Sequence, residues 1–112
     1  MGIAIRAKWE PMRVSGFATL GAAFSTLGTE LSNPARLLIF QNSTPVAVYI
    51  SFNGVDDNLM LIEQSYMVID LSSNKTVPQG FYQSQGDQVY VRLVGGPAIS
   101  GQVTLSVVYG SE

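Results

Sequence analysis

The chain has 112 residues, of which six are Lys or Arg and eight are Asp or Glu, so its net charge is −2 and its charged fraction is 12%. That fraction is about half of the roughly 25% usual for a soluble domain, and 30 residues are Ser, Thr, Asn or Gln instead. His and Cys are both absent, which excludes an imidazole base, a cysteine nucleophile, a disulfide and the usual zinc and haem sites.

Short alternating runs of β-branched and aromatic residues dominate the chain, whereas apolar residues rarely recur at helical spacing. Such runs predict strands. They fall at 13–20, 35–42, 46–52, 59–62, 65–71, 81–84, 87–94 and 102–109. The segment 21–31 could form a helical face, but Gly28 and Thr29 cut that face short and favour an extended strand with a loop. Segment 72–80 reads as a surface loop.

Seven or eight short strands at a spacing of roughly ten residues are typical of a two-layer β-sandwich. We predict an all-β fold with a single antiparallel β-sandwich, jelly-roll-like or Ig-like, over residues 13–110, and an extended N-terminal arm over 1–12. Alternation in the last two strands predicts core rows, namely Val89, Val91, Leu93, Val103, Leu105, Val107 and Tyr109. The Gly, Pro and Ser residues between these strands predict a C-terminal antiparallel hairpin with a long connection.

The densest polar cluster could supply oxygen ligands to calcium. It consists of Asn53, Asp56, Asp57 and Asn58. An EF-hand loop needs acidic or amide residues at alternate positions, followed by a bidentate Glu, and that pattern is absent. A solvated turn is therefore the favoured interpretation, and we expect neither a metal site nor a cofactor.

Catalytic carboxylates or serines find little support in the sequence. Glu63 and Asp70 flank one predicted strand, but a glycosidase pair needs a defined separation and a sugar cleft. A serine nucleophile without His would need a lysine or an N-terminal amine as its base. Lys8 and Lys75 lie in a tail-like and a loop-like segment, which are poor places for a desolvated base. We therefore expect no catalytic residue and no enzymatic activity.

Five tyrosines lie in or beside predicted strands, and they leave two interpretations open. They are Tyr49, Tyr66, Tyr82, Tyr90 and Tyr109. Such rings could stack on sugars, since tyrosine combines an apolar body with a polar tip. Packing in a core or an interface is the favoured alternative, because tyrosine is common in strands.

The low charge favours a subunit that hides much of its surface in an assembly, since charged side chains are depleted where subunits meet. The predicted N-terminal arm carries candidate interface residues, namely Ile3, Ile5, Trp9 and Met12. The arm could dock on a neighbouring subunit with Trp9 as its anchor. It could equally pack as an edge strand on its own sandwich.

Three stretches resemble small structural proteins of tailed bacteriophage virions. They read NPARLLIFQNSTPVAVYISFNGVDDN, SYMVIDLSSNK and QGDQVYVRLVGGPAISGQVTLSVVYG. The resemblance lies in the order of a strand with an Asn/Thr-type turn, a strand ending in Asn-Gly, a Ser-aromatic strand closing on Asp, and two final strands. It covers roughly residues 13–110. It implies a β-sandwich virion component without enzymatic activity, present in symmetric copies around the neck or on the capsid.

The expected function is a head-to-tail connector or collar subunit that forms a ring through its sandwich faces and its arm. A capsid decoration protein is the alternative within this class, and a carbohydrate- or receptor-binding module of the virion is the alternative outside it. The expected partners are other copies of the chain and the portal, connector, tail or major capsid protein. We therefore expect a protein located in the virion and made in the host cytoplasm.

Two further partner classes are not expected. Six dispersed basic residues in a chain of net charge −2 cannot neutralise the phosphates of a typical duplex-binding site, so no direct nucleic-acid binding is expected. Apolar runs such as 37–40 and 46–50 are far shorter than the roughly 20 residues that span a bilayer, so no membrane is expected. The start of the chain also lacks the apolar core of a secretory signal.

Overall fold

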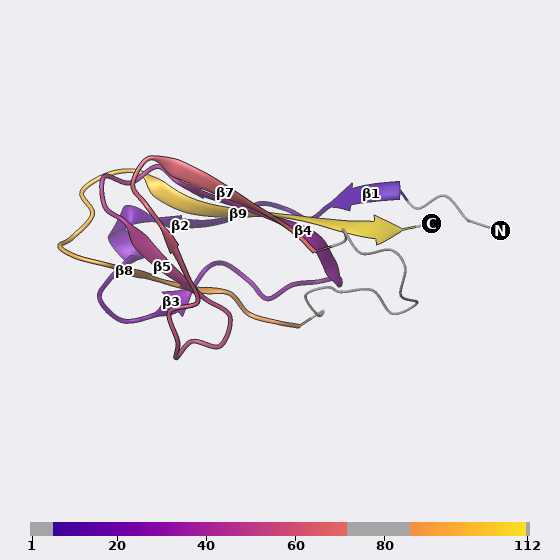
Figure 1. Cartoon of the computed structure of the whole chain (residues 1–112), viewed down its shortest axis with the longest axis horizontal. Helices are drawn as coiled ribbons and strands as arrows, with labels where there is room; N and C mark the ends of the chain where they lie inside the picture. The colour runs from indigo at the N-terminus through magenta and orange to yellow at the C-terminus, as the bar shows by residue number, and fades with distance from the viewer. Residues whose placement is uncertain (1–5, 72–85, 112) are drawn as a thin grey trace.

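The computed structural model describes residues 6–71 and 86–111, which form two antiparallel sheets packed as a sandwich (Figure 1). Sheet A has the order β1-β9-β4-β7, with β2 also on β9; its strands are β1 (Arg6–Trp9), β2 (Arg13–Gly16), β4 (Ala35–Asn42), β7 (Ser65–Asp70) and β9 (Gln102–Ser111). Sheet B has the order β3-β8-β5-β6; its strands are β3 (Ser25–Thr26), β5 (Val48–Ser51), β6 (Leu59–Leu61) and β8 (Tyr90–Leu93). The predicted all-β sandwich is confirmed.

Most predicted strands are present, with shifted ends. The prediction for 35–42 matches β4, while the 13–20 run stops at Gly16 and continues as a 3-10 turn over Phe17–Thr19. The ambiguous 21–31 segment is extended and contributes the short β3. The predicted strand 81–84 and the predicted loop 72–80 lie outside the described residues.

The predicted C-terminal hairpin is wrong, because β8 and β9 lie in different sheets. β8 pairs with β3 and β5, whereas β9 pairs with β1, β2 and β4. The alternation itself is correct: the predicted core residues of both strands are buried, apart from the half-buried Tyr109. Each strand presents its apolar row to the same core from an opposite layer, and two strands can share a core without pairing.

The core lies between the two sheets and is made of aliphatic side chains around one aromatic pair. Phe40 of β4 is fully buried and meets Phe52 edge to face, with ring centroids 6.4 Å apart. Val48 and Ile50 of β5 belong to the same core and are at most 1% exposed. Burial of such side chains is the main driving force of folding.

The described part of the predicted N-terminal arm is an edge strand of its own sandwich. β1 pairs with the end of β9 in the register Trp9 to Val108, and the two strands extend as a ribbon beyond the sandwich layers in Figure 1. The Glu10 amide then donates to the carbonyl of Val107 at 3.0 Å, which continues the pairing. Ile3 and Ile5 lie outside the described residues. This placement matches the edge-strand alternative for residues 6–9, and contact with a neighbour stays a prediction.

Candidate functional site

The register of sheet A fixes which side chains share its outer face, because directly opposite residues of antiparallel strands point to the same side. Trp9 lies opposite Val108, which lies opposite Leu37. Two residues further along β4, Ile39 lies opposite Val68 of β7. Apolar side chains therefore cross the outer face from one edge of the sheet to the other.

Residues of β2 and the start of β7 enlarge this surface. Val14 alternates with the inward-pointing Arg13 and is 43% exposed, and Met12 beside it is 52% exposed. We call this surface the open face; its apolar side chains are Trp9, Met12, Val14, Leu37, Ile39, Tyr66, Val68 and Val108. Trp9 is 61% exposed and Val68 is 51% exposed, so large apolar groups stand in solvent.

Charge is scarce on the open face. Among the described residues that the register places there, Asp70 is the charged one, at the edge opposite Leu37. Arg36 is exposed at the same end, where the β4–β9 register shifts. The open face thus has exposed apolar side chains on its edge strands and little charge, which is a composition typical of interaction surfaces.

Part of the outer face of sheet B, around Tyr90 and Arg92, is covered by the chain itself, whereas Met60 on this face is 51% exposed. The loop from β5 to β6 hangs below this sheet in Figure 1, and Gly54 approaches Tyr90 so closely that an added Cβ would lie 3.2 Å from its ring. Asp57 of the same loop accepts two hydrogen bonds from Arg92, at 2.9 and 2.6 Å. The Arg92 guanidinium also lies over the Tyr49 ring, 4.6 Å from its centroid.

This arrangement gives the polar cluster of the 53–58 loop a structural role. Asn53 Oδ1 accepts the amides of Val55 and Asp56, both at 2.9 Å, which is a turn that an asparagine side chain stabilises. The hydrogen bond to Asp57 raises the pKa of Arg92 above its ordinary value, against a smaller opposing effect of desolvation. Within the part of the chain that the structure describes, no three acidic side chains are grouped to hold a metal ion.

A buried ion pair lies at the start of β2, the strand that contributes Val14 to the open face. Arg13 donates to Glu10 Oε1 at 2.7 Å, and both side chains are at most 5% exposed. The same guanidinium donates to the carbonyls of Thr29 and Glu30, at 2.8 and 2.7 Å. These contacts join the start of β2 to the loop that precedes β4.

The carboxylate of Glu10 is equally well satisfied. Burial raises the pKa of Glu10, but hydrogen bonds from Asn33, Arg13 and the Ser32 amide, together with the Arg13 charge, outweigh burial and lower that pKa below its ordinary value of 4.5. Neighbouring Gly28 has a φ of 70° and would place a Cβ 2.6 Å from that of Arg13, so the loop needs glycine there. Sequence reasoning missed this network, although a charge at an inward position of β2 was a signal for it.

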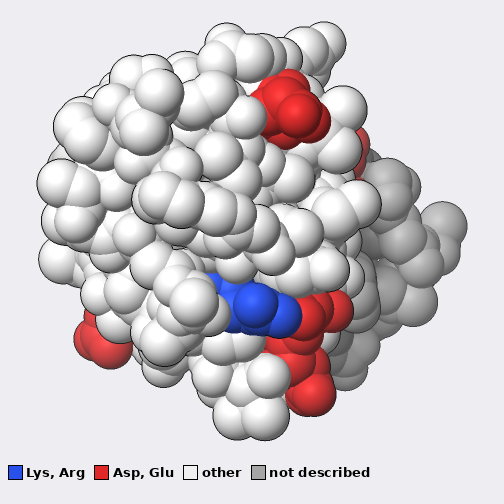
Figure 2. Space-filling view, turned by 90° about the vertical axis from the view of Figure 1, so that its left-hand side faces the viewer, with Lys and Arg blue, Asp and Glu red and all other residues white. Residues whose placement is uncertain are grey.

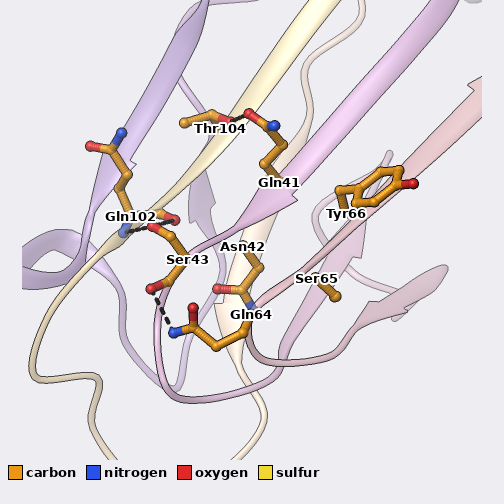
Figure 3. Close-up of a pocket in the computed structure, with 8 residues that line it drawn as sticks. All are labelled: Gln41, Asn42, Ser43, Gln64, Ser65, Tyr66, Gln102 and Thr104. Atoms are coloured by element: carbon orange, nitrogen blue, oxygen red, sulfur yellow. Dashed lines mark hydrogen bonds between the residues drawn. The ribbon is translucent and has the colours of Figure 1, made fainter.

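A polar pocket lies at one end of the open face, where β4 ends and β7 and β9 begin (Figure 3). Its volume is about 350 Å³. We call it the amide pocket; its lining residues are Gln41, Asn42, Ser43, Gln64, Ser65, Tyr66, Gln102 and Thr104. Figure 2 views the molecule from this end, where the surface is largely uncharged apart from small coloured groups.

The other predicted candidates are separated. Glu63 precedes β7 and Asp70 ends it, so the two residues lie at opposite ends of a strand whose five residue steps span about 17 Å. Lys8 is exposed on β1, and Lys75 and Tyr82 lie outside the described residues. Tyr90 lies against Gly54 of the sheet B loop and Tyr49 lies under the Arg92 guanidinium, whereas Tyr66 is 72% exposed.

Comparison of the chain with protein-family models finds no match, and comparison with curated proteins finds none either. The resemblance to phage structural proteins therefore stays a prediction. In the described residues, no helix is long and apolar enough to cross a membrane.

Proposed function

We propose that this protein is a non-enzymatic structural subunit of a tailed-phage virion, a head-to-tail connector or collar subunit that assembles into a ring. The open face carries this proposal, because it presents Trp9, Met12 and Val68 to solvent on a surface with little charge. A surface of that kind is stable in water when a neighbouring subunit covers it. Tryptophan is also among the residues that most often anchor an interface.

The position of Trp9 and Met12 gives the ring proposal a geometric basis. Both belong to the N-terminal segment, and both lie beside the sheet face that they extend. One contact can therefore use the N-terminal segment and the sandwich face together. A ring needs each subunit to present this face to a different surface of the next subunit, since head-to-tail contacts close into cyclic symmetry.

Protein counting and imaging of the particle test the proposal. Mass spectrometry and cryo-electron microscopy of purified virions should find the protein at the head–tail junction in a cyclic number of copies, about six or twelve. Copies on the order of hundreds, spread over the shell, would favour the capsid decoration alternative. Absence of the protein from purified particles would overturn both.

A further inference from the structure

We propose that the amide pocket binds a neutral saccharide. The pocket shares Tyr66 with the open face, but the proposal does not require virion assembly, because Trp9 and Met12 are not among the lining residues. The volume of about 350 Å³ is within the range of small-molecule sites. The pocket opens between three strand ends of one sheet, so its walls are held by backbone pairing rather than by a loop alone.

The lining of the pocket contains hydrogen-bonding groups without formal charge. Four lining residues carry amides, three carry aliphatic hydroxyls and one carries a phenol. Each amide offers two donors and one acceptor, and each hydroxyl offers both functions. A phosphate, a carboxylate or a cation would find no opposite charge among these residues. A polyhydroxylated neutral ligand would find a partner for each hydroxyl.

The amides divide into fixed and available groups. Asn42 forms the floor: it is 2% exposed, its nitrogen donates to the carbonyls of Val46, Leu61 and Ile62, and its oxygen accepts from Thr44. All of its hydrogen-bonding capacity is used within the fold. Asn42 therefore shapes the pocket and does not bind the ligand.

Gln41 and Gln64 keep free capacity while being held in place. The Thr104 hydroxyl donates to Gln41 Oε1 at 3.2 Å, so that the Gln41 nitrogen is directed away from Thr104 in Figure 3. The Gln64 nitrogen donates to the carbonyls of Ser43 and Thr44, at 3.0 and 3.2 Å, which leaves its oxygen as an acceptor. Groups positioned in advance lose little entropy when a ligand binds.

Tyr66 supplies the apolar surface that a sugar ring needs. It lies directly opposite Gln41, which in turn lies opposite Thr104, so a phenol, an amide and a hydroxyl stand in a row at intervals of about 5 Å. Tyr66 is 72% exposed, and its hydroxyl makes no hydrogen bond within the described residues. In the proposed complex a sugar ring stacks on Tyr66, and one of its hydroxyls accepts a hydrogen bond from the Gln41 nitrogen.

An array of defined oligosaccharides, neutral and sialylated, tests the proposal on the full chain. We expect binding to neutral members, and titration calorimetry with the best of them should give an affinity that changes little between low and high salt, since no ion pair forms. The side-chain amide signals of Gln41 and Gln64 should shift in an NMR titration with the same sugar. No binding to any neutral member, or tighter binding to sialylated members, would overturn the proposal.

Variants of Tyr66 place the binding in the pocket. Tyr66→Ala should weaken the affinity at least about tenfold, and Tyr66→Phe, which keeps the ring and the fold, should weaken it by a few-fold. Trp9→Ala is the matched control, because Trp9 is another exposed aromatic residue on the same sheet face, at its other end. Equal affinity of Tyr66→Ala and the unaltered chain would contradict the site. Loss of assembly in Trp9→Ala with sugar binding retained would separate the two proposals.

Discussion

The outer faces of the two sheets differ in how far other residues of the chain cover them. Sheet B is partly covered by its own loop, which packs Gly54 on Tyr90 and pairs Asp57 with Arg92. Sheet A has no such cover in the described residues, although Trp9 and Val68 stand on it. This contrast is the basis of our proposal that a partner covers the outer face of sheet A.

Two ion pairs among the described residues differ in burial, and this difference allows the test with the largest expected effect. Arg13→Met should lower the free energy of unfolding by about 3 to 5 kcal/mol, because it leaves the Glu10 carboxylate buried without its cation. Arg92→Met, at the exposed pair on sheet B, should have a much smaller effect, since water screens that pair. Urea unfolding of both variants measures the difference. Equal losses of unfolding free energy in the two variants would contradict the difference between the buried pair Glu10–Arg13 and the exposed pair Asp57–Arg92.

A substitution in the sheet B loop should have a smaller effect. Gly54→Ala should cost about 1 to 2 kcal/mol, because Gly54 has a φ of 77° and its new Cβ would lie 3.2 Å from the Tyr90 ring. Gly95→Ala is the control, since a Cβ at Gly95 meets nothing within 4 Å. Thermal unfolding of both variants provides the measurement. A loss at Gly95 as large as that at Gly54 would show that the loop does not pack on Tyr90.

Acid should weaken the buried ion pair between Glu10 and Arg13. The pKa of Glu10 is lower in the folded protein than its ordinary value of 4.5, so the folded state binds fewer protons than the unfolded state. The stability from this group is therefore present above about pH 4.5 and is lost as the pH falls through the folded pKa. Urea midpoints measured between neutral and acidic pH give this loss of stability. Below about pH 4.5, stability should fall less steeply with falling pH in Glu10→Gln than in the unaltered chain. The same slope of stability against pH in Glu10→Gln and in the unaltered chain would contradict the role of Glu10.

Much of the fold is predictable from the sequence because strand alternation is a local property. The row Val103, Leu105 and Val107 indicates a buried strand face without any knowledge of its partner, and the bounds of β4 follow from one apolar run. Pairing is not local, and this is why the predicted hairpin failed: the turn residues 95–101 fit a hairpin and a crossover between layers equally well.

The candidate site was harder to predict, because its parts meet only through the register. Trp9 and Met12 were identifiable as apolar residues without an assigned partner, but Leu37, Ile39 and Val68 join them on one face only after β4 is placed between β7 and β9. The sequence contains even fewer indications of the amide pocket. Gln41, Gln64 and Gln102 are ordinary polar residues in sequence and converge only where three strands end.

The most direct test of the open face compares two exposed apolar residues on the outer faces of the two sheets. Val68 on sheet A and Met60 on sheet B are each 51% exposed, and each lies on an edge strand. Sedimentation and native mass spectrometry of Val68→Lys, Met60→Lys and the unaltered chain would measure their assembly, with thermal unfolding as the check on folding. We predict that Val68→Lys stays folded but does not assemble, while Met60→Lys assembles like the unaltered chain. Normal assembly of Val68→Lys, or equal loss in both variants, would contradict the assignment of the open face as the interface.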